Sequence, residues 1–293
     1  MTRYREGFID VNRVRLYYRV AGEGAPTKLI CLHGGPGGSC DYLSPLLKLS
    51  ERGGVEVLLY DQFGCGRSSD PPNDSYYTVE YGVEEVEGIR RTLYGDEKVF
   101  LLGHSYGGLL AIAYALKYQR NLRGLIVSSG LSSVPLTVKE MRRLINELPE
   151  QTRRVIEKYE ATGEFTHPEY LRAVDDFYRK HLLRLPEMPP DVAKTMEYLQ
   201  KRRVYSIMNG PNEFTITGTI RDWDQTSRLG EIKVPTLITV GRYDEVTPTV
   251  AEVIHRGIPN STLKVFENSS HMAMWEETEK YLTTIIDFIT HVG

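Results

Sequence analysis

The sequence has few cysteines, no long apolar run and little net charge. Its 293 residues include three cysteines, Cys31, Cys40 and Cys65, and such an odd, sparse set is a poor disulfide framework. We therefore expect a reducing, cytoplasmic setting. The longest apolar run, 109–116, is far shorter than the roughly 20 residues of a membrane-spanning helix. A net charge of −3 gives no electrostatic footprint for DNA or RNA. These features predict a protein without a membrane or nucleic-acid partner.

The sequence also lacks the common signatures of metal and cofactor sites. It contains neither a G-x-x-x-x-G-K-[ST] phosphate loop nor an H-E-x-x-H zinc motif. No group of histidines and cysteines has the spacing of zinc ligands. The stretch Gly64-Cys65-Gly66 has Ser69 where a dinucleotide fingerprint requires its third glycine. We therefore expect no metal ion and no organic cofactor.

Short apolar runs alternate with helical stretches in the first and last thirds of the chain. Strands that are apolar on both faces and separated by helices are typical of a parallel sheet covered by helices. The fold class is therefore α/β, with a mostly parallel central sheet. The pattern predicts a hairpin over 8–20, strands over 28–32, 55–60, 99–102, 125–127, 235–240 and 263–266, and an amphipathic helix over 278–289.

The middle of the chain is charged and favours helices instead of strands. Capping boxes that begin at Thr137 and Thr166 predict two helix starts. Asp191 is a candidate cap for a third helix that runs to about Ser206. We therefore predict a helical insertion in an α/β core. The predicted division is a core of residues 1–131 and 222–293 with a helical cap of residues 132–221.

The clearest local motif is Gly103-His104-Ser105-Tyr106-Gly107. It matches G-x-S-x-G and lies between a predicted buried strand and an apolar helix, which is the context of a nucleophile elbow. Such a tight turn requires small residues on both sides of the serine. An incidental serine in a glycine-rich turn is the alternative, and the strand-turn-helix context disfavours it. We predict Ser105 as a nucleophile.

A serine hydroxyl needs a general base, and Asp244 and His271 complete the chain order Ser, Asp, His. Each follows a predicted strand, so both are expected at the same edge of the sheet as Ser105. His271 would accept the serine proton, and Asp244 would orient and stabilise the imidazole. Asp222 and Asp224 are rival acids, but no predicted strand presents them. At the ordinary histidine pKa, activity would fall below roughly pH 6.5.

Acyl transfer also needs donors for the developing oxyanion. One is expected to be the backbone N–H of Tyr106, which follows the nucleophile. The other is expected from the loop His33-Gly34-Gly35-Pro36-Gly37-Gly38. We favour the Gly37 amide, and Gly35 is the alternative, because spacing alone does not distinguish them.

Together with this loop and elbow, two further segments resemble the proline iminopeptidases. These are Asp61-Gln62-Phe63-Gly64-Cys65-Gly66-Arg67-Ser68 and Gly241-Arg242-Tyr243-Asp244. The resemblance covers the whole chain and is strongest to archaeal members that interact with the tricorn protease. It implies an α/β-hydrolase fold whose helical insertion is a cap domain. It also implies serine aminopeptidase activity and, as a possible partner, a larger protease that supplies short peptides.

In that family, carboxylates on the cap side bind the free amino group of the substrate. Glu213 and Glu245 resemble those positions. An ammonium group has three donors, and burying it without partners is costly, so two carboxylates would restrict cleavage to the first peptide bond. The alternative is that Glu213 is a surface charge and that Glu245 merely follows Asp244.

The resulting hypothesis is a serine aminopeptidase that releases an N-terminal residue, proline or apolar, from short peptides with a free N-terminus. A carboxylesterase or lipase would use the same Ser105, Asp244 and His271 but would not need the carboxylates. A ligand-binding or scaffold protein on the same fold is the non-enzyme alternative, because fold alone does not determine function.

Overall fold

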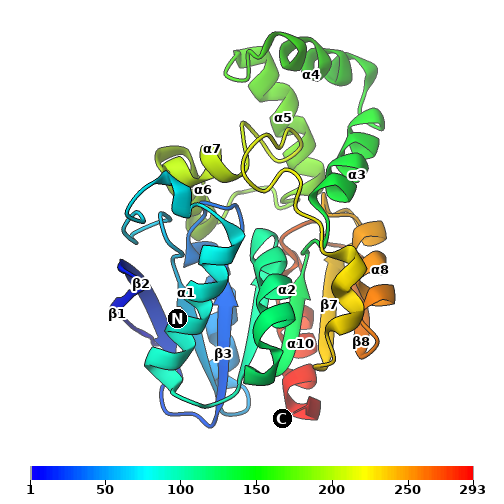
Figure 1. The fold of residues 1–293 in the computed structure, drawn as a ribbon. Coiled ribbons are helices and arrows are strands. Elements are labelled where there is room, and N and C mark those ends of the chain that lie inside the picture. Colours follow the sequence, from blue (N-terminus) through cyan, green and yellow to red (C-terminus); the bar gives the residue numbers. More distant parts are fainter. Residues whose placement is uncertain (1, 293) are drawn as a thin grey trace.

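An eight-stranded sheet runs through the computed structural model, which describes residues 2–292 (Figure 1). The strand order is β1-β2-β4-β3-β5-β6-β7-β8. The pairs β1–β2 and β2–β4 are antiparallel, and every later pair is parallel, which confirms the predicted fold class. The strands are β1 (Arg5–Val11), β2 (Val14–Ala21), β3 (Thr27–Leu32), β4 (Val55–Tyr60), β5 (Val99–His104), β6 (Leu122–Ser128), β7 (Thr236–Gly241) and β8 (Ser261–Phe266).

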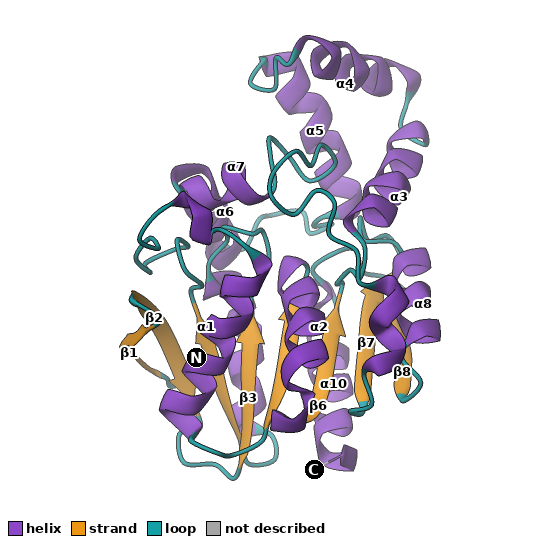
Figure 2. Ribbon diagram, in the orientation of Figure 1, coloured by secondary structure: helices purple, strands orange, loops and turns teal. Residues whose placement is uncertain are grey.

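Helices cover both faces of the sheet (Figure 2). Alternate residues of β3 point to opposite sides, as the strand period of two requires. Ile30 packs in the core cluster that includes α2, whereas Leu29 packs in the cluster that includes α10 and the 3₁₀ helix η1. No helix within residues 2–292 is long and apolar enough to cross a membrane. The flanking helices are η1 (Cys40–Glu51), α1 (Val79–Tyr94), α2 (Tyr106–Tyr118), α8 (Pro248–Gly257), α9 (Ala273–Glu276) and α10 (Thr278–Val292), with the 3₁₀ turns η2 (Asp74–Tyr76), η3 (Gln119–Asn121) and η4 (Thr226–Glu231).

Five further helices follow β6 and lie beyond the carboxyl ends of the parallel strands (Figure 1). We call α3 to α7 the inserted helices. The helix α6 is joined to the core by side chains: the Ser44 hydroxyl donates to Asp191 Oδ2 at 2.5 Å, and Thr195 Oγ1 lies 2.9 Å from Ser39 Oγ. The helices α3 and α5 are joined to the core as well, because Glu140 accepts from the Thr247 hydroxyl and the His181 carbonyl accepts from the Glu245 backbone N–H. The inserted helices therefore form a roof over the core. They are α3 (Val134–Asn146), α4 (Glu150–Thr162), α5 (Pro168–His181), α6 (Pro190–Lys201) and α7 (Arg203–Met208).

The predicted starts of the inserted helices are wrong by one to a few residues. The first helix begins at Val134, because Ser133 is its cap and accepts from the backbone N–H of Leu136. The hydroxyl of Thr137 donates to the Ser133 carbonyl instead. His167, one residue after the predicted Thr166, caps α5.

The predicted single helix from Asp191 to about Ser206 is interrupted. Arg202 has extended backbone angles, φ −100° and ψ 141°, and separates α6 from α7. Its guanidinium donates to the carbonyls of Gly64 and Ser68 in the core. These bonds hold the break in place. The division of the chain at residues 132 and 221 stays a prediction.

Candidate active site

Ser105 lies in a sharp turn between β5 and α2. Its backbone φ of 58° and ψ of −125° are unusual for a residue with a side chain. A Cβ at residue 103 would lie 1.9 Å from the Gly107 carbonyl oxygen, and a Cβ at residue 107 would lie 2.3 Å from the Leu32 carbonyl oxygen. Glycine is therefore required on both sides, and the turn has the geometry of a nucleophile elbow.

Asp244 and His271 meet at the carboxyl edge of the sheet, after β7 and β8. His271 Nδ1 lies 2.7 Å from Asp244 Oδ1, and both side chains are buried. The same carboxylate oxygen accepts from the backbone N–H of Val246 at 2.9 Å. Ser105 and His271 line one cavity. No hydrogen bond joins these two side chains within residues 2–292, and such bonds are often long before substrate binds.

The ring of His104 packs against the ring of His271. The two ring centroids are 4.7 Å apart, and His104 Nε2 lies 2.8 Å from the His271 carbonyl oxygen. The other ring nitrogen, Nδ1, lies 2.8 Å from the Tyr42 hydroxyl. Burial lowers the pKa of His104 well below its ordinary value, so this ring is neutral and serves to hold its neighbour. Its place beside Ser105 in the motif was the only sequence signal for this contact.

The glycine-rich loop places two candidate oxyanion donors in one bend. Gly35 and Gly37 have φ of 120° and 108°, and a Cβ at residue 35 would lie 2.6 Å from the Gly37 nitrogen. Gly35 lines the cavity with Ser105, and it also lines a small adjoining pocket with Ser105 and Tyr106. The Gly37 amide, in contrast, donates a hydrogen bond to the Cys65 thiol. This bond opposes the rise in the pKa of the thiol that burial causes. The cavity lining therefore gives Gly35 some support, and the assignment of the second donor stays a prediction.

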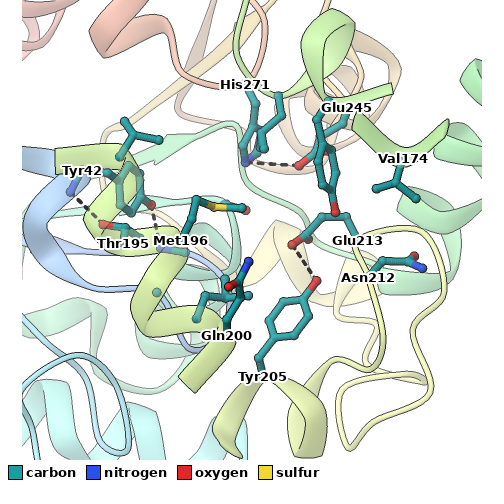
Figure 3. A pocket seen from close by; sticks show the side chains of 18 of the residues that line it. Tyr42, Val174, Thr195, Met196, Gln200, Tyr205, Asn212, Glu213, Glu245 and His271 are labelled. Atoms are coloured by element: carbon teal, nitrogen blue, oxygen red, sulfur yellow. Dashed lines mark hydrogen bonds and ion pairs between the residues drawn. The ribbon is translucent and has the colours of Figure 1, made fainter. Parts of the chain in front are cut away.

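Two carboxylates, Glu245 and Glu213, lie near the imidazole in the cavity (Figure 3). Glu245 is buried; its Oε1 lies 3.8 Å from His271 Nε2, and its Oε2 has no hydrogen-bond partner in the described chain. Glu213 Oε1 accepts from the Tyr205 hydroxyl at 2.8 Å. The structure thus brings Glu213 and Glu245 to the cavity that Ser105 lines. The supporting Tyr205 had no signal in the sequence.

The charges around His271 oppose the effect of its burial. Burial alone would lower the pKa of this imidazole, but Asp244, Glu245 and Glu213 raise it to about 9. Burial also raises the pKa of Glu245 well above its usual range, and the charge of His271 opposes that rise. The acid limit of roughly pH 6.5 expected from an ordinary histidine therefore moves upward in the free protein.

The cavity lies between the carboxyl edge of the sheet and the inserted helices. Its volume is about 500 Å³, which is in the range of small-molecule and peptide sites. One end is polar and holds Ser105, His271, Glu213 and Glu245. Among the described lining residues there is no lysine or arginine, so His271 is the basic side chain that faces the two glutamates. The apolar walls come from Phe165, Tyr170, Leu171, Val174, Met196 and Leu199.

Comparison with known proteins identifies the family. The α/β hydrolase fold model matches residues 28–278. The proline iminopeptidase of Saccharolobus solfataricus is 61% identical over 98% of this chain and 93% of its own length. That of Thermoplasma volcanium is 56% identical over 99% of this chain and 98% of its own length. This chain belongs to the proline iminopeptidase family.

A solved member of the family has the same architecture from end to end. The proline iminopeptidase of Mycobacterium smegmatis superposes with a TM-score of 0.92 at 32% identity, and the match covers 98% of each chain. The similarity therefore includes the inserted helices as well as the core. Membership of the family confirms the resemblance that the loop and elbow motifs indicated.

Proposed function

We propose that this protein is a serine aminopeptidase that releases an N-terminal residue, proline or apolar, from short peptides. The observation that carries the proposal is the meeting of Ser105, the Asp244–His271 pair and two carboxylates in one cavity. A carboxylesterase would need no pair of acidic groups, and a scaffold would need no reactive serine. Both alternatives are less well supported by the family and by this geometry.

In the proposed reaction, Ser105 Oγ attacks the carbonyl carbon of the first peptide bond. His271 Nε2 accepts the hydroxyl proton and then gives it to the leaving amine. Asp244 holds Nδ1 and stabilises the imidazolium. The Tyr106 amide and an amide of the loop, from Gly37 or Gly35, stabilise the oxyanion. Water then attacks the acyl-enzyme by the same steps and releases the free residue.

The two glutamates are proposed to bind the substrate's ammonium group. An unpaired Glu245 oxygen in a buried position is costly, and an ammonium would supply the missing donor. Binding the amino end beside the nucleophile places the first peptide bond, and no later one, at Ser105. The apolar walls then accept the first side chain, because removing the apolar surface of proline and aliphatic side chains from water is favourable.

Peptides are the substrates that fit this family, and the proposal extends to their source and to the cellular setting. A roof of inserted helices above a cavity of about 500 Å³ favours short chains over folded proteins. A larger protease that supplies short peptides is therefore a fitting partner, as the resemblance to the tricorn-interacting members implies. The three cysteines are free and buried, which fits a cytoplasmic setting.

Blocking the substrate's amino group should distinguish an aminopeptidase from an esterase. We expect kcat/KM for an N-acetyl prolyl amide to be at least about a hundredfold below that for the unblocked amide, because a buried carboxylate would lose its charged partner. Release of a chromogenic amine measures both. Equal or faster turnover of the acetylated compound would contradict the proposal and favour an esterase.

The change Glu213→Gln should weaken binding of the unblocked substrate. The glutamine oxygen can still accept from Tyr205, so the variant removes charge and keeps shape. We expect KM to rise about tenfold to a hundredfold with a smaller change in kcat, since the interaction is made in the ground state. The exposed Glu231→Gln, whose carboxylate pairs with Arg228, is the control. Equal effects of the two variants would remove Glu213 from the proposed site.

A further inference from the structure

The base of the proposed triad is paired with a second carboxylate in the structure. His271 Nδ1 lies 2.7 Å from Asp244, and its Nε2 lies 3.8 Å from Glu245 Oε1. The nitrogen that should take the proton of Ser105 is therefore in an ion-pair position with Glu245 (Figure 3). An imidazole between two carboxylates is favoured in its charged form, and a charged imidazole cannot act as a base.

We propose that Glu245 keeps His271 protonated while the cavity is empty and that the substrate's ammonium group releases this hold. The inference rests on the proposed function and adds a second role to its ammonium site. The incoming ammonium takes the place of the imidazolium as the partner of Glu245. The proton on Nε2 then leaves to solvent, and the neutral Nε2 accepts the proton of Ser105. A cationic substrate thereby switches on the base that cleaves it.

Burial makes this exchange of partners effective. The side chains of His271 and Glu245 are 3% and 2% exposed, so water screens their attraction weakly. Glu245 Oε2 has no other partner in the described chain, and no lysine or arginine lines the cavity there. Burial raises the pKa of Glu245 and the imidazolium opposes that rise, so Glu245 and His271 carry their charges as a pair. Among the described lining residues, the imidazolium is the one cation beside this carboxylate until a substrate brings another.

The remaining groups around His271 do not change this conclusion. Asp244 favours the charged imidazole whether or not substrate is bound, and Glu213 lies farther away, bonded to Tyr205. His104 packs against the ring at an interplanar angle of 57° and is neutral. From α5, the carbonyl of His181 accepts the backbone N–H groups of both His271 and Glu245, and burial lowers the pKa of its own ring. The direction of the effect is thus set by Asp244 and Glu245.

An uncharged reagent that modifies serine tests whether Glu245 keeps His271 protonated, because such a reagent does not bind at the ammonium site. We expect a dialkyl nitrophenyl phosphate to modify Ser105 with a rate that rises with pH and is half-maximal near 9, the pKa of His271. The change Glu245→Gln should move that midpoint down by about one unit, so that modification at pH 7 is about tenfold faster. The same variant should lose at least about tenfold in kcat/KM on an unblocked prolyl amide.

These opposite changes separate the proposal from a structural role. Loss of both reactivities by a Glu245→Gln variant that keeps the unfolding temperature of the parent protein would overturn the inference. The same holds if Glu245→Gln reacts with the phosphate no faster than the parent protein. Either result leaves the aminopeptidase proposal standing, since that proposal depends on the blocked substrate and on Ser105. Glu231→Gln is the matched control and should match the parent protein in both assays.

A second measurement leaves Glu245 intact. In the Ser105→Ala variant, binding of a prolyl dipeptide at pH 6.5, where its amine is already protonated, should release about one proton. Calorimetry in two buffers of different ionisation enthalpy measures this number. Binding without proton release would overturn the inference, because the ammonium would then not have displaced the proton on His271.

Discussion

The Ser105→Ala variant is expected to lose the aminopeptidase activity by on the order of 10⁴-fold or more in kcat. Without the hydroxyl there is no acyl-enzyme, and direct attack by water would have only the oxyanion donors to assist it. Release of a chromogenic amine from an unblocked prolyl or aliphatic amide measures the loss. Turnover within about tenfold of the parent protein would eliminate Ser105 as the nucleophile.

The fold of this variant should be unchanged. The Ser105 side chain caps no helix, and alanine tolerates the turn no worse than serine. The unfolding temperature should therefore stay close to that of the parent protein, and substrate should still bind. Ser206→Ala, which removes an exposed hydroxyl on α7, is the control and should retain activity. A large drop in the unfolding temperature of the Ser105 variant would attribute the lost activity to unfolding instead.

The parts of the site that follow buried strands could be predicted from the sequence. Ser105, Asp244 and His271 lie within five residues of the ends of β5, β7 and β8, and the carboxyl ends of parallel strands meet at one edge. The glycines at 103 and 107 signal the turn because a Cβ there would collide with backbone. In such segments the local sequence predicts the tertiary position, because the residues that follow parallel strands lie at the same edge of the sheet.

The inserted helices offer no such rule. The capping pattern at Thr137 is present in the sequence, yet Ser133 caps the helix four residues earlier, because several residues could cap it. The break at Arg202 depends on carbonyls at Gly64 and Ser68, more than 130 residues away. The bond from Tyr205 to Glu213 likewise depends on how the loop after α7 folds back. Such contacts are set by tertiary packing, which a single sequence does not display.

The pKa of His271 likewise could not be predicted from the sequence alone. The sequence gives the residue type and hence an ordinary histidine value. The shift to about 9 arises because Asp244, Glu245 and Glu213 come from two separate loops to face one buried ring. Chain order indicated Asp244, and the resemblance indicated Glu213 and Glu245, but the distances of these acids from Nδ1 and Nε2 determine whether the imidazole is a free base.

The Asp244→Asn variant is the second large expected loss, about 10⁴-fold in kcat. An asparagine amide can donate to Nδ1, which leaves the proton on Nε2 and so puts the imidazole in the wrong tautomer to accept from Ser105. Removing this carboxylate also removes the strongest of the electrostatic attractions that raise the pKa of His271. The residual activity should therefore show its acid limb at lower pH than the parent protein, although its maximum is far smaller.

Steady-state rates of amine release across pH 6 to 10 would check both features of this variant. Asp222→Asn is the matched control, because Asp222 is exposed and pairs with Arg221, away from the cavity. It should keep the parent rate and pH profile. A loss of less than about tenfold in Asp244→Asn would mean that His271 is oriented without its 2.7 Å partner. In that case Glu245, the other carboxylate beside the ring, would have to orient His271. The Glu245→Gln variant would then abolish activity.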